Sequence, residues 1–148
     1  MKFSFQGDDV AALPPDQKTA ILESLLIALF ADGHAAEKES EQFNHQVEAI
    51  NWGVDRTALL EMLTTARARV ASVTNAAQAG ELIRSAAGKL TNPDIRVKVF
   101  RAMGAINAAD GTMAKTELKV LADFAQIFQL TKEQVDEVKA DVIASQKT

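Results

Sequence analysis

The chain of 148 residues is long enough for one domain with a sizeable core, and its 47% hydrophobic and 24% charged residues are typical of a globular protein. A net charge of −4 argues against a general DNA- or RNA-binding role, because phosphate binding needs a basic face. The absence of cysteine excludes disulfides, thiolate chemistry and cysteine-based zinc sites.

Helix-forming residues dominate the composition. Ala, Leu, Glu, Lys and Gln are abundant, there is no Tyr, and Thr and Val are scattered, so we predict an all-α fold. The longest apolar run, residues 25–31, is far too short to span a bilayer. The first residues contain no apolar stretch of signal-peptide length. These features predict a soluble, cytoplasmic protein.

Residues 1–13 form a predicted N-terminal arm, and residues 14–148 a single helical domain. The first helix opens at residues 14–16, where proline suits the first turn, and ends at Gly33. Its apolar residues recur at three- and four-residue spacing, which predicts one broad buried face. They are Ile21, Leu22, Leu25, Leu26, Leu29 and Phe30.

The second helix is expected over residues 36–52, and Asp55 is a predicted N-cap for the third, whose apolar side includes Leu60. A connection at residues 71–75 leads to a weaker fourth helix, which contains two glycines. Asn92 then begins the fifth helix, which ends at Gly111.

The sixth helix is expected over residues 114–128, with Leu118 on its inward side. Residues 131–134 have the sequence of a capping box and begin the last helix. The chain is therefore expected to form a bundle of about seven helices.

One short stretch occurs twice, 78 residues apart. An Ala-Asp-Gly triplet stands at residues 31–33 and again at residues 109–111, and a glutamate follows each Asp by seven residues. An apolar helix precedes each copy, and a helix with a capped turn follows it. We therefore predict two related three-helix units, residues 14–72 and 92–148, with the fourth helix between them.

This duplicated pattern resembles the TerB-like tellurite-resistance family, over roughly residues 17–143. The resemblance implies an all-helical bundle that can bind metal through acidic residues of the two loops. It also implies a role in tellurite resistance and stress response, as a membrane-associated signalling or scaffold module rather than an enzyme. The corresponding acids are Asp32, Glu39, Asp110 and Glu117. The second loop departs from the family pattern, because it lacks additional acids and contains Lys115.

Two interpretations of these acids remain open. If the loops meet, their carboxylates suit a hard divalent cation such as Ca²⁺ or Mg²⁺. Alternatively, Gly ends one helix, Asp satisfies amides of the turn, and Glu caps the next helix and meets its dipole. An EF-hand is excluded, since its first and third ligand positions would be Ala28 and Phe30 in the first copy.

The charge of the chain is unevenly distributed. Residues 1–65 carry a net charge of −7, whereas residues 66–101 carry +5. This basic segment either binds an anionic partner, such as the surface of a membrane, or lies against acids of the same molecule. Its cations are Arg67, Arg69, Arg84, Lys89, Arg96, Lys98 and Arg101.

The leading functional prediction is a non-catalytic binding or regulatory module that engages a protein partner, binds no nucleic acid and responds to divalent ions. Peripheral association with a membrane is a further interpretation. The alternative from another class is a small metal-dependent hydrolase or lyase that uses the acidic loop cluster. An enzyme needs converging carboxylates in a cleft, whereas a binding module needs an exposed apolar patch.

Overall fold

The computed structural model describes residues 4–30, 37–109 and 115–146. Within these ranges the protein forms seven α-helices and no strand, which confirms the predicted all-α fold. The helices are α1 (Pro15–Leu29), α2 (Glu37–Ala49), α3 (Arg56–Ala71), α4 (Ala76–Lys89), α5 (Pro93–Asn107), α6 (Lys115–Ile127) and α7 (Lys132–Gln146).

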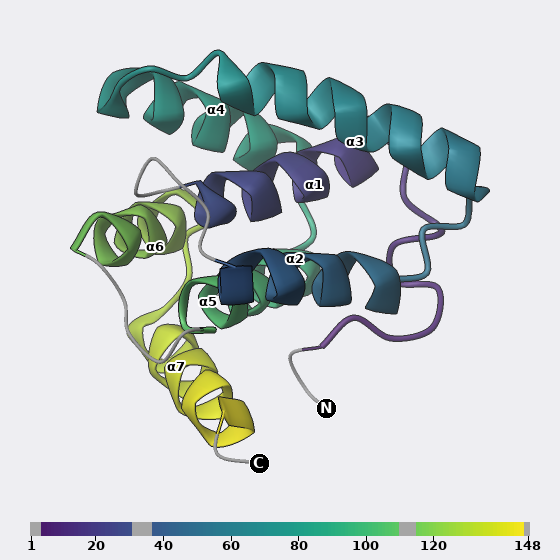
Figure 1. The fold of residues 1–148 in the computed structure, drawn as a ribbon. Coiled ribbons are helices and arrows are strands. Elements are labelled where there is room, and N and C mark those ends of the chain that lie inside the picture. Colours follow the sequence, from purple (N-terminus) through teal and green to yellow (C-terminus); the bar gives the residue numbers. More distant parts are fainter. Residues whose placement is uncertain (1–3, 31–36, 110–114, 147–148) are drawn as a thin grey trace.

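Helix α1 lies at the centre of the fold, with α3 and α4 on one side and α2 and α5 on the other (Figure 1). Nearly all of its residues from Lys18 to Leu29 are buried, Glu23 and Ser24 among them. The sequence predicted one buried face of this helix, but the burial extends around most of its circumference. Because α2, α3, α4, α5 and α6 all contact α1, little of its circumference reaches water.

Helix α5 is the second central helix. Every residue from Ala102 to Asn107 is buried, and the helix contacts α1, α2, α6 and α7. Helices α2 and α3 follow α1 and pack on it, and α6 and α7 follow α5 and pack on α5. In addition, α2 contacts α5, and α6 contacts α1. This packing is what two related three-helix units would produce, although the duplication itself stays a prediction.

Several helices start with the local capping interactions that the sequence predicted. The Asp55 side chain accepts a hydrogen bond from an amide in the first turn of α3, and the Asn92 side chain accepts two from the first turn of α5. At the start of α7, Thr131 and Gln134 form a reciprocal capping box with distances of 2.9 and 3.0 Å. These three predicted caps are confirmed.

Residues 4–13 pack against the helices. Val10 is buried in the core, and Ala11 approaches the turn that precedes α3. Gly53 in this turn has a φ of +71°, and a Cβ atom built there would lie 2.8 Å from the Cβ of Ala11. Only glycine suits both the left-handed backbone and this close approach. The division between arm and domain stays a prediction.

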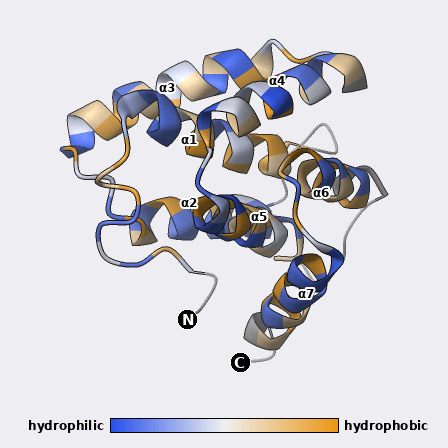
Figure 2. Ribbon diagram, turned by 180° about the vertical axis from the view of Figure 1, so that it is seen from behind, coloured by the Kyte–Doolittle hydropathy of each residue, from blue (hydrophilic) through white to orange (hydrophobic). Residues whose placement is uncertain are grey.

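The hydropathy of the helices matches their central or outer position in the fold. Figure 2 shows α1 as largely hydrophobic, whereas hydrophobic and hydrophilic residues alternate along the outer helices α3 and α7. Throughout the described ranges, no helix is both long enough and apolar enough to cross a membrane.

Candidate functional site

The structure describes the predicted metal-binding acids only in part. Asp32 and Asp110 lie outside the described residues, together with the glycine that follows each. Glu117 is the third residue of α6, where its backbone alone is described. Glu39 lies in the first turn of α2, and this residue is 1% exposed. The metal site at these four acids therefore stays a prediction.

The helix ends that lead into the two Asp-Gly stretches lie against each other. The Nδ2 atom of Asn107 in α5 donates a hydrogen bond of 2.6 Å to the carbonyl oxygen of Ala28 in α1, and both residues are buried. Ala28 stands four residues before Asp32, and Asn107 stands three before Asp110. The acids of the two stretches can share one ion only if the stretches lie close together, and the helix ends from which they begin do lie together.

Glu39 is compatible with both interpretations of the acids. A buried carboxylate is unfavourable unless polar or charged groups stabilise it, and Glu39 interacts with other groups of the protein. Its place in the first turn suits the dipole of α2. A donor set of four carboxylates also suits Ca²⁺ or Mg²⁺. Among the described side chains alone, no group of three or more His, Asp and Glu residues is arranged to hold a metal ion.

Much of the basic segment is engaged within the molecule. Three of its cations form ion pairs, with N–O distances between 2.6 and 3.0 Å, to acids outside the segment. These contacts favour the interpretation that the segment lies against acids of the same chain. The pairs are Arg69 with Glu23, Lys98 with Asp9, and Arg101 with Asp141.

Arg96 has a different internal role, because it binds backbone carbonyls rather than a carboxylate. Its guanidinium donates hydrogen bonds to the carbonyl oxygens of Leu90, Ala87 and Phe128, and it lies 5.7 Å from the ring centroid of Phe128. Arg96 therefore joins the C-terminal ends of α4 and α6, where carbonyl groups lack helical partners.

Two described carboxyl groups have shifted pKa values. Burial raises the pKa of Glu23, and the nearby cations, Arg69 first, partly offset this effect. The pKa of Asp9 is lowered by a hydrogen bond from Lys98 and by another from a backbone amide. Neither carboxyl group lines either of the two large grooves described next.

Among the grooves on the surface of the described structure, two have volumes of about 680 and 710 Å³. The α6–α7 groove, of about 710 Å³, lies between α5, α6 and α7, and its lining includes Phe100, Leu118, Leu121, Val135 and Ile143. The α3–α4 groove, of about 680 Å³, lies between α3, α4, α6 and the C-terminal end of α1. The lining of the α3–α4 groove includes Ile27, Phe30, Arg67, Val70, Gly80, Ile83 and Val120.

Sequence reasoning missed both grooves because it assigned some of their apolar residues to the core. Leu118 and Phe30 were predicted to be buried, but they are 49% and 39% exposed. Leu60, also predicted to face inward, is 50% exposed on α3. Helical spacing identifies an apolar side, but it does not reveal whether a neighbouring helix covers all of it.

Comparison with protein families matches residues 18–140 to the family model described as "Tellurite resistance protein TerB". Comparisons with curated proteins and with solved structures gave no significant match. The matched region covers most of the chain and includes all of the helices from α2 to α6. It agrees with the resemblance predicted from the duplicated motif, and the chain belongs to the TerB tellurite resistance family.

Proposed function

We propose that this TerB-family protein is a non-catalytic, cytoplasmic binding module that contributes to tellurite resistance or stress response by engaging a protein partner. Family membership supports the connection with tellurite resistance. The observation that carries the binding role is the α6–α7 groove, which presents apolar side chains to solvent.

The groove exists because α6 and α7 each pack on α5 but have few direct contacts with each other. Leu118 on α6 and Ile143 on α7 line the space between them and are 49% and 53% exposed. Single apolar side chains on a surface are ordinary, but several that line one groove are typical of an interaction site.

The shape and charge of the groove favour an amphipathic helix as its occupant. Such a helix can place its apolar face between two helices of the receptor. Lys132, Asp136 and Lys139 line the α7 wall at four- and three-residue spacing, so both signs of charge stand beside the apolar floor. A partner helix with polar residues of both signs along its flanks is therefore expected.

Divalent-ion sensitivity is part of the proposal. The carboxylates of Asp32, Glu39, Asp110 and Glu117 would hold Ca²⁺ or Mg²⁺, which are bound through oxygen ligands. The support is the hydrogen bond between Asn107 and Ala28, which joins the helix ends that lead into both acidic stretches. A cation there would link the two halves of the molecule.

The alternative function, a small metal-dependent hydrolase or lyase, would require several carboxylates that converge in a cleft. Among the described lining residues, Asp136 is the acid of the α6–α7 groove and Asp123 is the acid of the α3–α4 groove. One acid in each groove supports binding more than catalysis.

Charge insertion into the α6–α7 groove tests the proposal. Leu118→Glu and Ile143→Glu place a carboxylate on the apolar surface, and Leu60→Glu is the matched control, because Leu60 is 50% exposed but lies outside the groove. In cells that depend on this gene for tellurite tolerance, we expect both groove variants to lower tolerance to the level of the deletion. The Leu60 variant should retain it.

A photo-cross-linker introduced near the groove provides the second readout. It should capture the same partner in the wild-type and Leu60→Glu proteins, but not in Leu118→Glu. Circular dichroism checks that each variant is folded. Full tolerance and unchanged capture in a folded Leu118→Glu protein would remove the groove from the proposal.

A further inference from the structure

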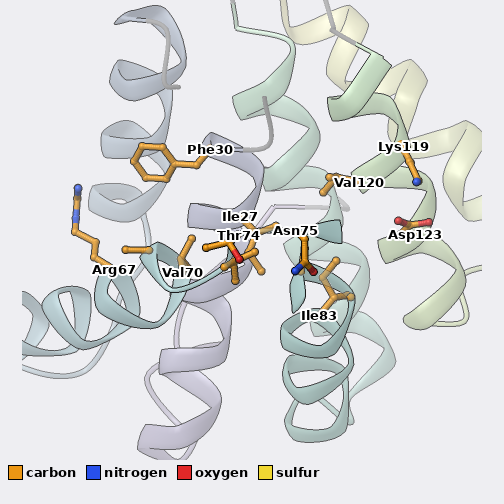
Figure 3. Close-up of a pocket in the computed structure, with 14 residues that line it drawn as sticks. Ile27, Phe30, Arg67, Val70, Thr74, Asn75, Ile83, Lys119, Val120 and Asp123 are labelled. Carbon is orange, nitrogen blue, oxygen red and sulfur yellow. The ribbon is translucent and has the colours of Figure 1, made fainter. Parts of the chain in front are cut away.

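The α3–α4 groove is separate from the proposed partner site and has the properties of a small-molecule pocket. Its volume of about 680 Å³ lies within the range usual for such pockets, about 300–1,000 Å³. Figure 3 shows Ile27, Val70, Ile83 and Val120 around the cavity, contributed by α1, α3, α4 and α6. These four side chains give it an apolar floor.

A glycine in α4, Gly80, leaves space in the groove because it has no side chain. Gly80 lies inside α4, where glycine is less favourable than alanine by about 1 kcal/mol, and its φ is not in the left-handed region. The backbone therefore does not require glycine at this position. The three heavy atoms nearest to a Cβ built there all belong to the side chain of Arg84, at 3.4 to 3.7 Å, which is ordinary van der Waals contact. A larger side chain at position 80, which lines the groove, would reduce the open space.

The charged residues of the groove are arranged asymmetrically. Lys119 and Asp123 lie one turn apart on the α6 wall, so this wall carries one charge of each sign. Arg67 stands at the rim on the opposite, α3 side (Figure 3). Its guanidinium lies 6.0 Å from the ring centroid of Phe43, and no described carboxylate forms an ion pair with it, in contrast to Arg69.

An exposed aromatic ring stands beside this cation. Phe30 follows the last residue of α1, is 39% exposed, and lies near Arg67 at the rim in Figure 3. The rim therefore combines a cation that forms no ion pair with any described carboxylate and an apolar surface that continues into the floor. A ligand with a single anionic head and an apolar body complements both features.

We propose that the α3–α4 groove binds a free amphiphilic carboxylate. Its hydrocarbon chain would lie on the floor formed by Ile27, Val70, Ile83 and Val120, beneath the ring of Phe30. The carboxylate would remain at the rim and accept hydrogen bonds from the Arg67 guanidinium, whose planar donors match a carboxylate. The site depends neither on the acidic loops nor on the α6–α7 groove.

Isothermal titration calorimetry with decanoate, below its critical micelle concentration, tests the head-group contact. Decanol serves as the neutral molecule of equal chain length. We expect saturable binding of decanoate at one site, weaker binding of decanol, and about tenfold weaker decanoate binding in Arg67→Gln, because a charge-assisted hydrogen bond is lost. Arg56→Gln, at the other end of α3, should leave decanoate binding unchanged.

A second pair of variants tests the location of the chain. Gly80→Leu fills the groove and should abolish binding of both molecules, whereas Gly88→Leu, on the same helix but outside the groove, should leave both unchanged. Both substitutions replace glycine with a better helix former, so α4 is expected to stay folded. Circular dichroism verifies this, and Arg67→Gln remains a test that leaves the helices unaltered.

Three results would overturn the proposal. Decanoate could fail to bind, it could bind equally well to Arg67→Gln, or it could bind normally to Gly80→Leu. Loss of binding in Leu118→Glu with normal binding in Gly80→Leu would place the chain in the α6–α7 groove instead.

Discussion

Asn107 of α5 donates a hydrogen bond of 2.6 Å to the backbone carbonyl oxygen of Ala28 in α1, and the contact is shielded from water. It joins the two central helices at the ends from which the acidic stretches follow. A carbonyl oxygen near the end of a helix lacks part of its helical hydrogen bonding. The Asn107 amide therefore satisfies a buried acceptor and fixes the relative position of two elements that are 79 residues apart.

Replacement of this amide should be destabilising. We expect Asn107→Ala to lower the free energy of unfolding by about 1–3 kcal/mol, because the buried carbonyl of Ala28 loses a donor. Urea denaturation followed by circular dichroism measures the change. Asn44→Ala, at an exposed position of α2, is the control and should alter stability by less than about 0.5 kcal/mol. A similarly small effect of Asn107→Ala would contradict the assigned role.

The contrast between this contact and the helix caps shows what the sequence could predict. The caps at Asp55, Asn92 and Thr131 depend on side chains and amides within a few residues, so their sequence patterns identified them. The Asn107 contact depends on how two helices that are far apart in the sequence pack together. A single sequence without an alignment contains no local signal for such a pair.

The same distinction applies to the candidate sites. The duplicated acids were visible as a spacing pattern, and the family that they indicated is confirmed. The grooves arise where helices fail to meet, as between α6 and α7. Glu23 did carry a local signal, because it is an acid inside the apolar run of α1, and its pairing with Arg69 explains how that run accommodates a charge.

Glu23 should make the protein less stable as the pH rises. Burial raises the pKa of this carboxyl group, so the folded state holds its proton more tightly than the unfolded state does. The stabilisation is complete below the unfolded pKa and is lost as the pH rises through the folded pKa. We therefore expect Glu23→Gln to gain stability relative to wild type as the pH rises above about 4 and through the folded-state pKa.

Denaturation curves of both proteins at several pH values measure this difference, and other titrating groups cancel in the comparison. Glu61→Gln, at an exposed position on α3, is the control and should show no comparable trend. A difference between wild type and Glu23→Gln that stays constant with pH would show that the Glu23 pKa is the same in the folded and unfolded states.

Asp9 should have the opposite pH dependence. The hydrogen bond from Lys98 lowers the pKa of Asp9, so its stabilisation is present above the unfolded pKa and is lost as the pH falls. Both side chains are partly exposed, so we expect Asp9→Asn to lose about 1 kcal/mol or less at neutral pH. The deficit should shrink below about pH 4, and added salt should reduce it at neutral pH.

A double-mutant cycle with Asp9→Asn and Lys98→Met isolates the interaction between Asp9 and Lys98. The hydrogen bond that Asp9 accepts from the backbone amide of Gln6 cancels in this comparison. The coupling energy should disappear at low pH. Equal coupling at neutral and acidic pH would indicate that the contact does not depend on the Asp9 charge.

Divalent ions should perturb the two Asp-Gly stretches together. We expect titration of the metal-free protein with Ca²⁺ or Mg²⁺, followed by NMR, to give saturable shifts of the Gly33 and Gly111 amides and their neighbours, because carboxylates of both stretches would share one ion. Zn²⁺ should be less effective, since the chain has no cysteine and the proposed ligands are all carboxylates.

Variants separate an ion site from helix capping. Glu39→Ala and Asp110→Ala should each abolish the shifts at both glycines, whereas Glu48→Ala, at an exposed position of α2, should leave them intact. If millimolar Ca²⁺ and Mg²⁺ leave both amides unshifted, the acids serve as caps. The capping interpretation then predicts that Glu39→Ala lowers stability equally with and without the ions, because the cap and the favourable charge at the α2 dipole are lost in either case.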